Sequence, residues 1–145
     1  MESPEVSRHL IDLYGVKIAQ EALSPHHLGV MQRPHATGTH EAANGDWVTF
    51  YLTIEEGRVQ SCWFTAQGNA VIFAGASVTA RLVQGMQIRH ALSHLDVPAL
   101  MEELGEVSEA DQFSLILVCE ALEKALKQSI VYIREPWKTL YTTNR

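Results

Sequence analysis

The chain has 145 residues, the size of one ordinary domain, and 46% of them are hydrophobic, which is enough to form a core. Its formal net charge of -6 leaves no excess of lysine and arginine to neutralise nucleic-acid phosphates or an anionic membrane surface. The most apolar stretch, Ala70 to Ala80, falls well short of the roughly 20 residues that span a bilayer. We therefore expect one domain over residues 1–145, located in the cytoplasm and without nucleic-acid or membrane partners.

The cysteines and the first residues support the same placement. Cys62 and Cys119 are too few for a disulfide framework and do not form a close Cys-x-x-Cys pair, so neither a zinc ribbon nor a thioredoxin-like redox site is expected. Residues 1–10 carry acidic and basic side chains instead of a basic segment followed by an apolar one, so they do not resemble a secretory signal.

The first part of the chain predicts one helix followed by an irregular connection. From Pro4 to Leu23, apolar residues recur at helical spacing and form one stripe, which is typical of an amphipathic helix. From Ser24 to Gly45 this periodicity stops, and prolines and glycines accumulate. We expect an extended loop there, with a short edge strand between Ala36 and Ala43.

The central part predicts a β-hairpin. From Trp47 to Ile54, aliphatic and phenylalanine side chains occupy every second position, which indicates a strand with one buried face. Residues 55–57 form a tight connection to a second antiparallel strand, Arg58 to Thr65, which is rich in β-branched and aromatic residues. Cys62 shares a face of this strand with Phe64, so we expect Cys62 to be a small core residue.

Three helices are predicted next along the chain. The first runs from Asn69 to a C-terminal glycine at Gly85, and its small residues predict close packing against the sheet. A shorter helix follows around Ile88 to Leu95. Another is opened by Asp96 and Pro98 and closed by Gly105.

A long final helix completes the prediction. Ser108 and Asp111 form a capping box at its start, and it should reach about Tyr132 before Pro136 stops it. We expect a loose polar tail from about residue 138. The fold class is therefore α+β, a small antiparallel sheet of about three strands with helices packed on one face.

Several short segments occur in a recognisable order and spacing. A loop with proline and glycine at 24–29 is followed by Asn44-Gly45-Asp46, directly before the first long strand. The later segments are Glu56-Gly57-Arg58-Val59, Gly68-Asn69-Ala70 leading into Ala74-Gly75-Ala76-Ser77, Gln84-Gly85, and Cys119 with Glu120-Ala121-Leu122-Glu123. Together they resemble the iron–sulfur cluster assembly scaffold family, of the IscU and NifU N-terminal type, over most of the chain.

The resemblance implies that three cysteines and an aspartate converge to hold zinc or a nascent iron–sulfur cluster, and that a cysteine accepts sulfur from a cysteine desulfurase. The matching positions are Asn44, Asn69 and Cys119 for the cysteines and Asp46 for the aspartate. We expect Asn44, Asn69 and Cys119 to lie near one another at one end of the sheet, with Cys119 as the cluster ligand and Asp46 and Cys119 as metal ligands. The implied partners are a cysteine desulfurase or other assembly proteins, a second copy, or an intact scaffold.

The two asparagines weaken that chemistry. An iron–sulfur cluster takes about four ligands, mostly thiolates with an occasional histidine. A structural zinc site takes about four Cys, His or carboxylate ligands. One thiolate and one carboxylate complete neither site, so we expect an iron–sulfur cluster or zinc to bind weakly or not at all unless a nearby histidine is recruited.

Cys119 and Asp46 also have purely structural interpretations. Cys119 falls on one helical stripe with Leu115 and Leu122, which favours a small buried hydrophobe as strongly as a reactive thiol. Asp46 follows a glycine at the entrance of a strand, where a carboxylate commonly caps a turn.

The histidines are a second source of ligands. His26, His27, His35 and His40 all precede Asp46, and we interpret them as solvated loop residues. His90 and His94 are four residues apart, as helical metal ligands are, but they lack the acidic partner of a zinc protease motif.

Two functional hypotheses follow. The first is a divergent scaffold that acts in iron–sulfur cluster assembly through Asp46 and Cys119. The second is a non-catalytic interaction or regulatory module that keeps the scaffold fold but binds no cluster. A hydrolase is disfavoured, because Ser77 lacks a Gly-x-Ser-x-Gly elbow and no nucleophile, base and orienting group can be assigned, so we do not expect an enzyme.

Overall fold

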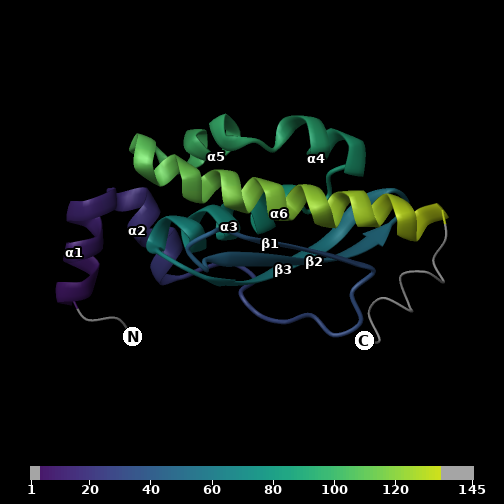
Figure 1. Ribbon diagram of the computed structural model, residues 1–145, viewed down its shortest axis with the longest axis horizontal. Helices are drawn as coiled ribbons and strands as arrows, with labels where there is room; N and C mark the ends of the chain where they lie inside the picture. The colour runs from purple at the N-terminus through teal and green to yellow at the C-terminus, as the bar shows by residue number, and fades with distance from the viewer. Residues whose placement is uncertain (1–3, 135–145) are drawn as a thin grey trace.

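A three-stranded antiparallel sheet backed by helices organises residues 4–134, the part of the chain that the computed structural model describes (Figure 1). The strands are adjacent in chain order, β1-β2-β3. This confirms the α+β class. The elements are α1 (Pro4–Tyr14), α2 (Val16–Leu23), β1 (Ala36–Glu41), β2 (Trp47–Glu55), β3 (Arg58–Gln67), α3 (Ala70–Val83), α4 (Ile88–His94), α5 (Val97–Leu104) and α6 (Glu109–Arg134).

The core lies between the sheet and two helices. The alternating residues of β2, from Val48 to Ile54, face inward, and Cys62 and Phe64 of β3 join them with no exposed surface, as expected. α6 covers β1 and β2, and α3 covers β3. At Gly38 of β1 an added Cβ would stand 2.2 Å from the backbone nitrogen of Ala125, so α6 rests directly on the strand.

The hairpin turn explains why β2 and β3 pair in this register. Glu56 and Gly57 both have positive φ angles, 52° and 74°, as a two-residue type I′ turn requires. Glu55 therefore pairs with Arg58, and a bulge between Thr53 and Ile54 shifts the register further along.

α4 and α5 lie on the side of α6 that faces away from the sheet (Figure 1). Asp96 caps α5 by accepting a hydrogen bond from the Ala99 N–H at 3.0 Å, and Gly105 ends that helix, as predicted. Ser108 caps α6 through the Asp111 N–H at 3.2 Å, but the Asp111 carboxylate accepts from the Ser108 hydroxyl and so replaces the return arm of a capping box.

The prediction of one continuous helix from Pro4 to Leu23 is wrong. Gly15 separates α1 from α2 with a φ of +91°, a left-handed conformation that ends one helix before the next begins. α1 has no buried residue, whereas α2 buries Ile18 and Ala19. The final helix runs to Arg134, slightly past the expected end. The predicted stop at Pro136 and the predicted loose tail from residue 138 lie outside the described residues. Within residues 4–134 no helix has the length and apolarity to cross a bilayer.

Candidate functional site

Asn44 and Asp46 form a hydrogen-bonded turn between β1 and β2. The side-chain oxygen of Asn44 accepts from the Asp46 N–H at 3.0 Å, and its amide nitrogen donates to Asp46 Oδ2 at 3.2 Å. Gly45 between them has a φ of +94°, which a side chain would strain. Asn44 and Asp46 therefore hold the turn together, whatever else they do.

Asn69 lies beside this turn and caps α3. Its Oδ1 accepts from the Ile72 N–H at 3.1 Å, as an N-cap residue does. The preceding Gly68 approaches Asp46 so closely that an added Cβ would stand 3.2 Å from the carboxyl carbon. The close contact at Gly68 brings the β1–β2 turn and the start of α3 together.

Ser114 of α6 completes the group. The Asn69 amide nitrogen donates to Ser114 Oγ at 3.3 Å. Three segments thus converge at one end of the sheet, and we call Asn44, Asp46, Asn69 and Ser114 the ligand end. It offers two amides, a hydroxyl and one carboxylate, and it contains no thiol.

Cys119 is not part of the ligand end, so its expected place beside Asn44 and Asn69 is wrong. It follows Ser114 by five residues, which on an α-helix is about 7.5 Å along the axis and about 140° around it. Cys119 instead lines a hollow between α6 and the α4–α5 segment, beside Leu95 and Asp96. Burial, together with the charges of Asp96 and Glu120, raises the pKa of the Cys119 thiol to about 12.

Ser114 was missed because the sequence comparison followed the cysteine. A usable signal was present: Ser114 is a small polar residue inside the apolar run 113–118. A serine hydroxyl has nearly the shape of a cysteine thiol, and asparagine occupies the other two positions. A search for polar residues on the face of the last helix that meets Asn69 would have found it.

The four loop histidines contact the body of the protein. The side chain of His26 is 50% exposed, in agreement with its interpretation as a solvated residue, whereas those of His27, His35 and His40 are partly buried. The His26 ring lies 3.2 Å from both Glu21 Oε2 and Ser77 Oγ. The Ser77 hydroxyl is fully buried and donates to that glutamate at 2.7 Å, so it ties α3 to α2. His27 packs edge-on against Trp63 with ring centroids 5.6 Å apart.

The other two histidines of this group also connect elements. His35 accepts from the Ile54 N–H at 2.8 Å and stacks on Tyr132 of α6. His40 lies in β1 and contacts Glu120 and Lys124 of α6. These contacts fasten the 24–45 segment to the sheet and to α6.

The donor set at the ligand end does not fit a metal cluster. Clusters take soft thiolates, and zinc takes thiolate, imidazole or carboxylate ligands. Residues 4–134 contain no group of three or more His, Cys, Asp or Glu side chains placed to hold a metal ion. His90 and His94 stack on each other with ring centroids 3.9 Å apart and have no third ligand in that part of the chain.

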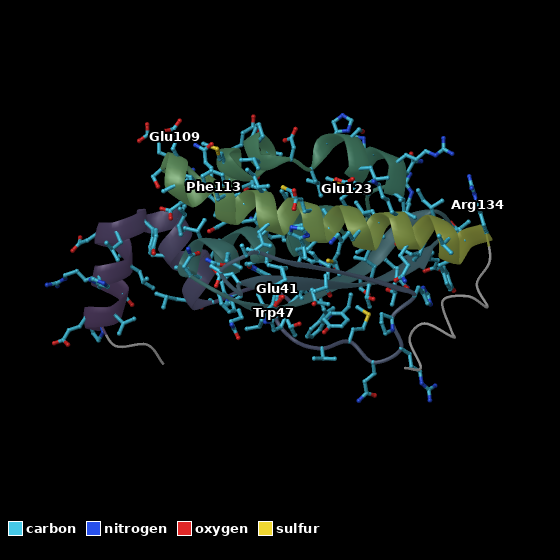
Figure 2. All side chains as sticks on the ribbon, in the orientation of Figure 1. Glu41, Trp47, Glu109, Phe113, Glu123 and Arg134 are labelled. Carbon is cyan, nitrogen blue, oxygen red and sulfur yellow. The ribbon has the colours of Figure 1, made fainter. Side chains whose placement is uncertain are left out.

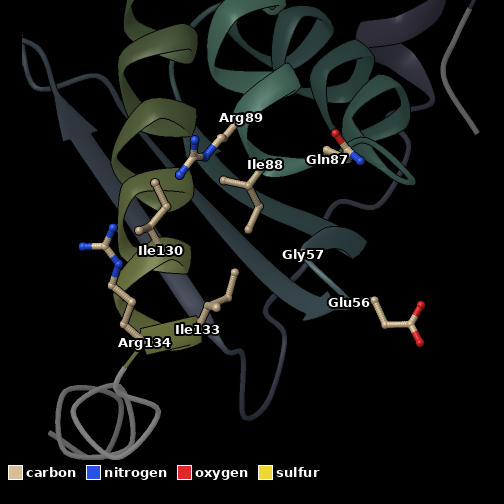
Figure 3. A pocket seen from close by; sticks show the side chains of 8 residues that line it. All are labelled: Glu56, Gly57, Gln87, Ile88, Arg89, Ile130, Ile133 and Arg134. Carbon is tan, nitrogen blue, oxygen red and sulfur yellow. The ribbon is translucent and has the colours of Figure 1, made fainter.

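A separate hollow of about 340 Å³ lies at the opposite end of α6 (Figure 3). Ile88, Ile130 and Ile133 form its apolar wall, and Arg89 and Arg134 flank them. The hairpin turn at Glu56 and Gly57 closes one side. No residue of the ligand end lines it.

The fold, a three-stranded antiparallel sheet covered by helices, places the protein in the α+β class. The chain belongs to the NifU-like N terminal domain family, whose model matches residues 13–132. Two relatives from Archaeoglobus fulgidus, the iron–sulfur cluster assembly scaffold proteins IscU 1 and IscU 2, are each 24% identical over 115 residues, which cover 79% of this chain and 74% of theirs.

Solved structures show the same fold. The N-terminal part of a nitrogen-fixing NifU-like protein from Brucella abortus aligns with a TM-score of 0.64 and 24% identity, over 84% of this chain and 97% of that one. A putative iron–sulfur cluster assembly scaffold protein for the SUF system from Fervidobacterium islandicum AW-1 aligns with a TM-score of 0.63 and 16% identity, over 80% and 98%.

Proposed function

We propose that this protein acts in iron–sulfur cluster assembly as a scaffold-fold docking protein that does not itself hold a cluster. One observation carries the proposal: the ligand end gathers Asn44, Asp46, Asn69 and Ser114, which provide one carboxylate and no thiolate. A cluster requires about four ligands, most of them thiolates. We infer that Ser114, rather than Cys119, stands where the family resemblance places the third thiol.

Each replacement also has a structural task that a cysteine would perform poorly. Asn44 closes the turn before β2, Asn69 caps α3, and Ser114 receives the Asn69 amide. A ligand end that is held together by its own hydrogen bonds needs no metal to keep its shape. This supports a role in which the protein binds other proteins through its surface and does not hold a cluster.

Both cysteines are poorly suited to accept sulfur. Cys62 is fully buried in the core, and burial raises the pKa of its thiol far above the ordinary value. Cys119 is partly buried, and its pKa of about 12 keeps it protonated at neutral pH. Since the thiolate is the reactive form, neither side chain fits a sulfur acceptor.

The partners that this function requires are other assembly proteins, among them a cysteine desulfurase. The Archaeoglobus relatives are named as assembly scaffolds, and this chain keeps their fold over most of its length. A protein that has the outer surface of a scaffold, but not its metal ligands, can bind the same partner proteins. Calorimetric titration against the desulfurase of the same cell measures this directly.

Reconstitution without oxygen tests the proposal. We expect the wild-type protein, incubated with iron and sulfide, to retain no stoichiometric iron and to show no cluster absorbance. The Asn44→Cys/Asn69→Cys/Ser114→Cys variant should bind zinc in equal amount, because three thiolates and Asp46 supply the roughly four ligands of a closed site.

The matched control is the double variant Asn44→Cys/Asn69→Cys, which keeps Ser114 and Cys119. It should bind zinc far more weakly than the triple variant, because Cys119 lies on another face of α6. Equal zinc binding by both variants would contradict the placement of Ser114. A stoichiometric cluster in the wild type that Cys119→Ser abolishes would overturn the proposal itself.

A further inference from the structure

A groove between α6 and the α4–α5 segment is separate from the ligand end. It encloses about 230 Å³, and its floor is apolar, formed by Leu92, Leu95 and Leu122 with the Cys119 thiol among them. Ile116 stands at the mouth of the groove with 41% of its surface exposed. An apolar floor and an exposed isoleucine together form a surface that favours contact with another apolar surface.

The apolar surface continues one helical turn beyond the groove. Phe113 precedes Ile116 by three residues on α6 and is 73% exposed, the largest value among the exposed large hydrophobic side chains of residues 4–134. Figure 2 shows Phe113 near the N-terminal end of this helix and Glu123 further along. From residue 113 to 123 the surface extends about 15 Å, the length of three helical turns.

The rim of the groove is acidic. Asp96, Glu120 and Glu123 line it, and no lysine or arginine does. His40 and Lys127 contact Glu120 and Glu123 from outside the groove. Residues 90–123 contain only acidic formal charges, and these are Asp96, Glu102, Glu103, Glu106, Glu109, Asp111, Glu120 and Glu123.

The negative field reaches the floor as well as the rim. Asp96 and Glu120 both contribute to the raised pKa of Cys119, after burial. Such a field repels anionic lipid and nucleic acid and attracts lysine and arginine. The chemistry that complements the groove is therefore an apolar stripe bordered by cationic side chains.

We propose that this groove docks a basic amphipathic helix of a partner protein, with its apolar stripe on Ile116 and the floor and its lysines or arginines against the acidic rim. The partner helix needs about three to four turns to cover the surface from Phe113 to Glu123. The inference rests on the proposed docking function and assigns the surface and the chemistry of the partner.

A synthetic helix tests the chemistry. The probe is a fluorescent 14-residue peptide with leucines at helical spacing and lysines elsewhere, measured by fluorescence anisotropy against the full chain. Two control peptides have glutamates in place of the lysines, or the same composition in an order without a stripe. We expect the first peptide to bind on the order of 10-fold more tightly than either control, because it alone matches both the apolar floor and the rim.

A matched pair of variants locates the site. Ile116→Glu places a charge in the groove, whereas Val131→Glu alters a residue of the same helix with 40% exposure, outside the groove. We expect Ile116→Glu to weaken peptide binding by on the order of 10-fold and Val131→Glu to leave it within about twofold. Circular dichroism of both variants checks that the helices are retained.

An Ile116→Cys variant provides a local reporter, because position 116 is exposed and lines the groove. Alkylation by N-ethylmaleimide, followed by mass spectrometry, should slow at position 116 when the lysine peptide is bound, and Cys62 serves as the buried internal reference. Equal binding of the scrambled peptide, insensitivity to Ile116→Glu, or an unchanged alkylation rate at position 116 would overturn the assignment. So would self-association that Ile116→Glu abolishes, since the groove would then hold a second copy.

These outcomes are independent of the cluster experiment. If the wild-type protein holds no cluster and does not bind the peptide, the proposed function stands and the groove assignment is wrong. If the protein forms a cluster at the ligand end, the proposed function is wrong, whether or not the peptide binds.

Discussion

α6 contributes to two regions of the molecule, its contact with β1 and the ligand end. Different kinds of interaction stabilise these two regions. At the first, Gly38 lets the strand touch the helix backbone at Ala121 and Ala125. At the second, side-chain hydrogen bonds join Asn44 to Asp46 and Asn69 to Ser114, and the close contact of Gly68 with Asp46 brings the two pairs together. Gly38 leaves no room for a larger residue, whereas at the four positions of the ligand end a side chain needs only to satisfy the local hydrogen bonds. The fold can therefore be retained when the side chains of the site, and with them its chemistry, change.

Gly38→Ala should lower the stability of the protein more than any substitution at the ligand end. The new Cβ would meet the backbone of α6 at 2.2 Å, and a backbone cannot rotate away as a side chain does. We expect a loss of about 3 kcal/mol or more in the free energy of unfolding, measured by urea denaturation. Gly75→Ala is the control, because its Cβ would meet side chains and no backbone, the end of Leu115 at 2.7 Å and Val118 at 3.5 Å, and it should change stability by no more than about 1 kcal/mol.

Asn69→Ala should have the largest effect within the ligand end. It removes the side chain that accepts from the Ile72 N–H and caps α3. We expect a loss of about 1 kcal/mol in urea denaturation, with the helix content unchanged. Asn69→Asp keeps the cap and should stay within about 0.5 kcal/mol of the wild type. Equal losses in both variants would show that the amide donated to Ser114 matters more than the cap.

Raising the pH should destabilise the protein through Cys119, because its thiol is packed in a partly buried place and resists ionisation. Its folded-state pKa of about 12 lies above its ordinary value of 9.0, so its contribution to stability is complete below about pH 9 and is lost as pH rises toward 12. The stability difference between the wild type and Cys119→Ala should shrink by roughly 1 kcal/mol between pH 8 and pH 10. A constant difference across this range would mean that the thiol ionises freely in the folded protein.

Ser114→Ala should have the smallest effect. It removes one exposed hydrogen bond to Asn69, while alanine favours the helix slightly more than serine does. We expect the free energy of unfolding to change by less than about 0.5 kcal/mol in thermal or urea denaturation. A loss above 1 kcal/mol would mean that the hydrogen bonds of the ligand end are coupled.

The strands and most helices were predictable because their signals are local. Alternation along Trp47–Glu55, the Glu56-Gly57 turn and the start of α5 at Asp96 each depend on a few neighbouring residues. The break at Gly15 was missed because the apolar stripe continues through it. Periodicity reports which face of a helix is apolar, but not whether one glycine has left the helical conformation.

The site was predictable only in part, because it depends on how α6 is placed. Asn44, Asp46 and Asn69 lie in turns next to β-strands, where the register follows from the hairpin. The matching residue of α6 depends on the rotation and translation of a long helix over the sheet. An offset of five residues keeps the apolar stripe plausible and exchanges Cys119 for Ser114. Tertiary contact alone decides between them.

The left-handed glycine at position 15 has a consequence for how this protein diverges. α1 lies before it, has no buried residue, and is largely outside the segment 13–132 that the family model matches. A helix that adds little to the core is free to accumulate substitutions that would be purged from α2 or α6. Its sequence should therefore drift faster among orthologues than that of α2 or α6.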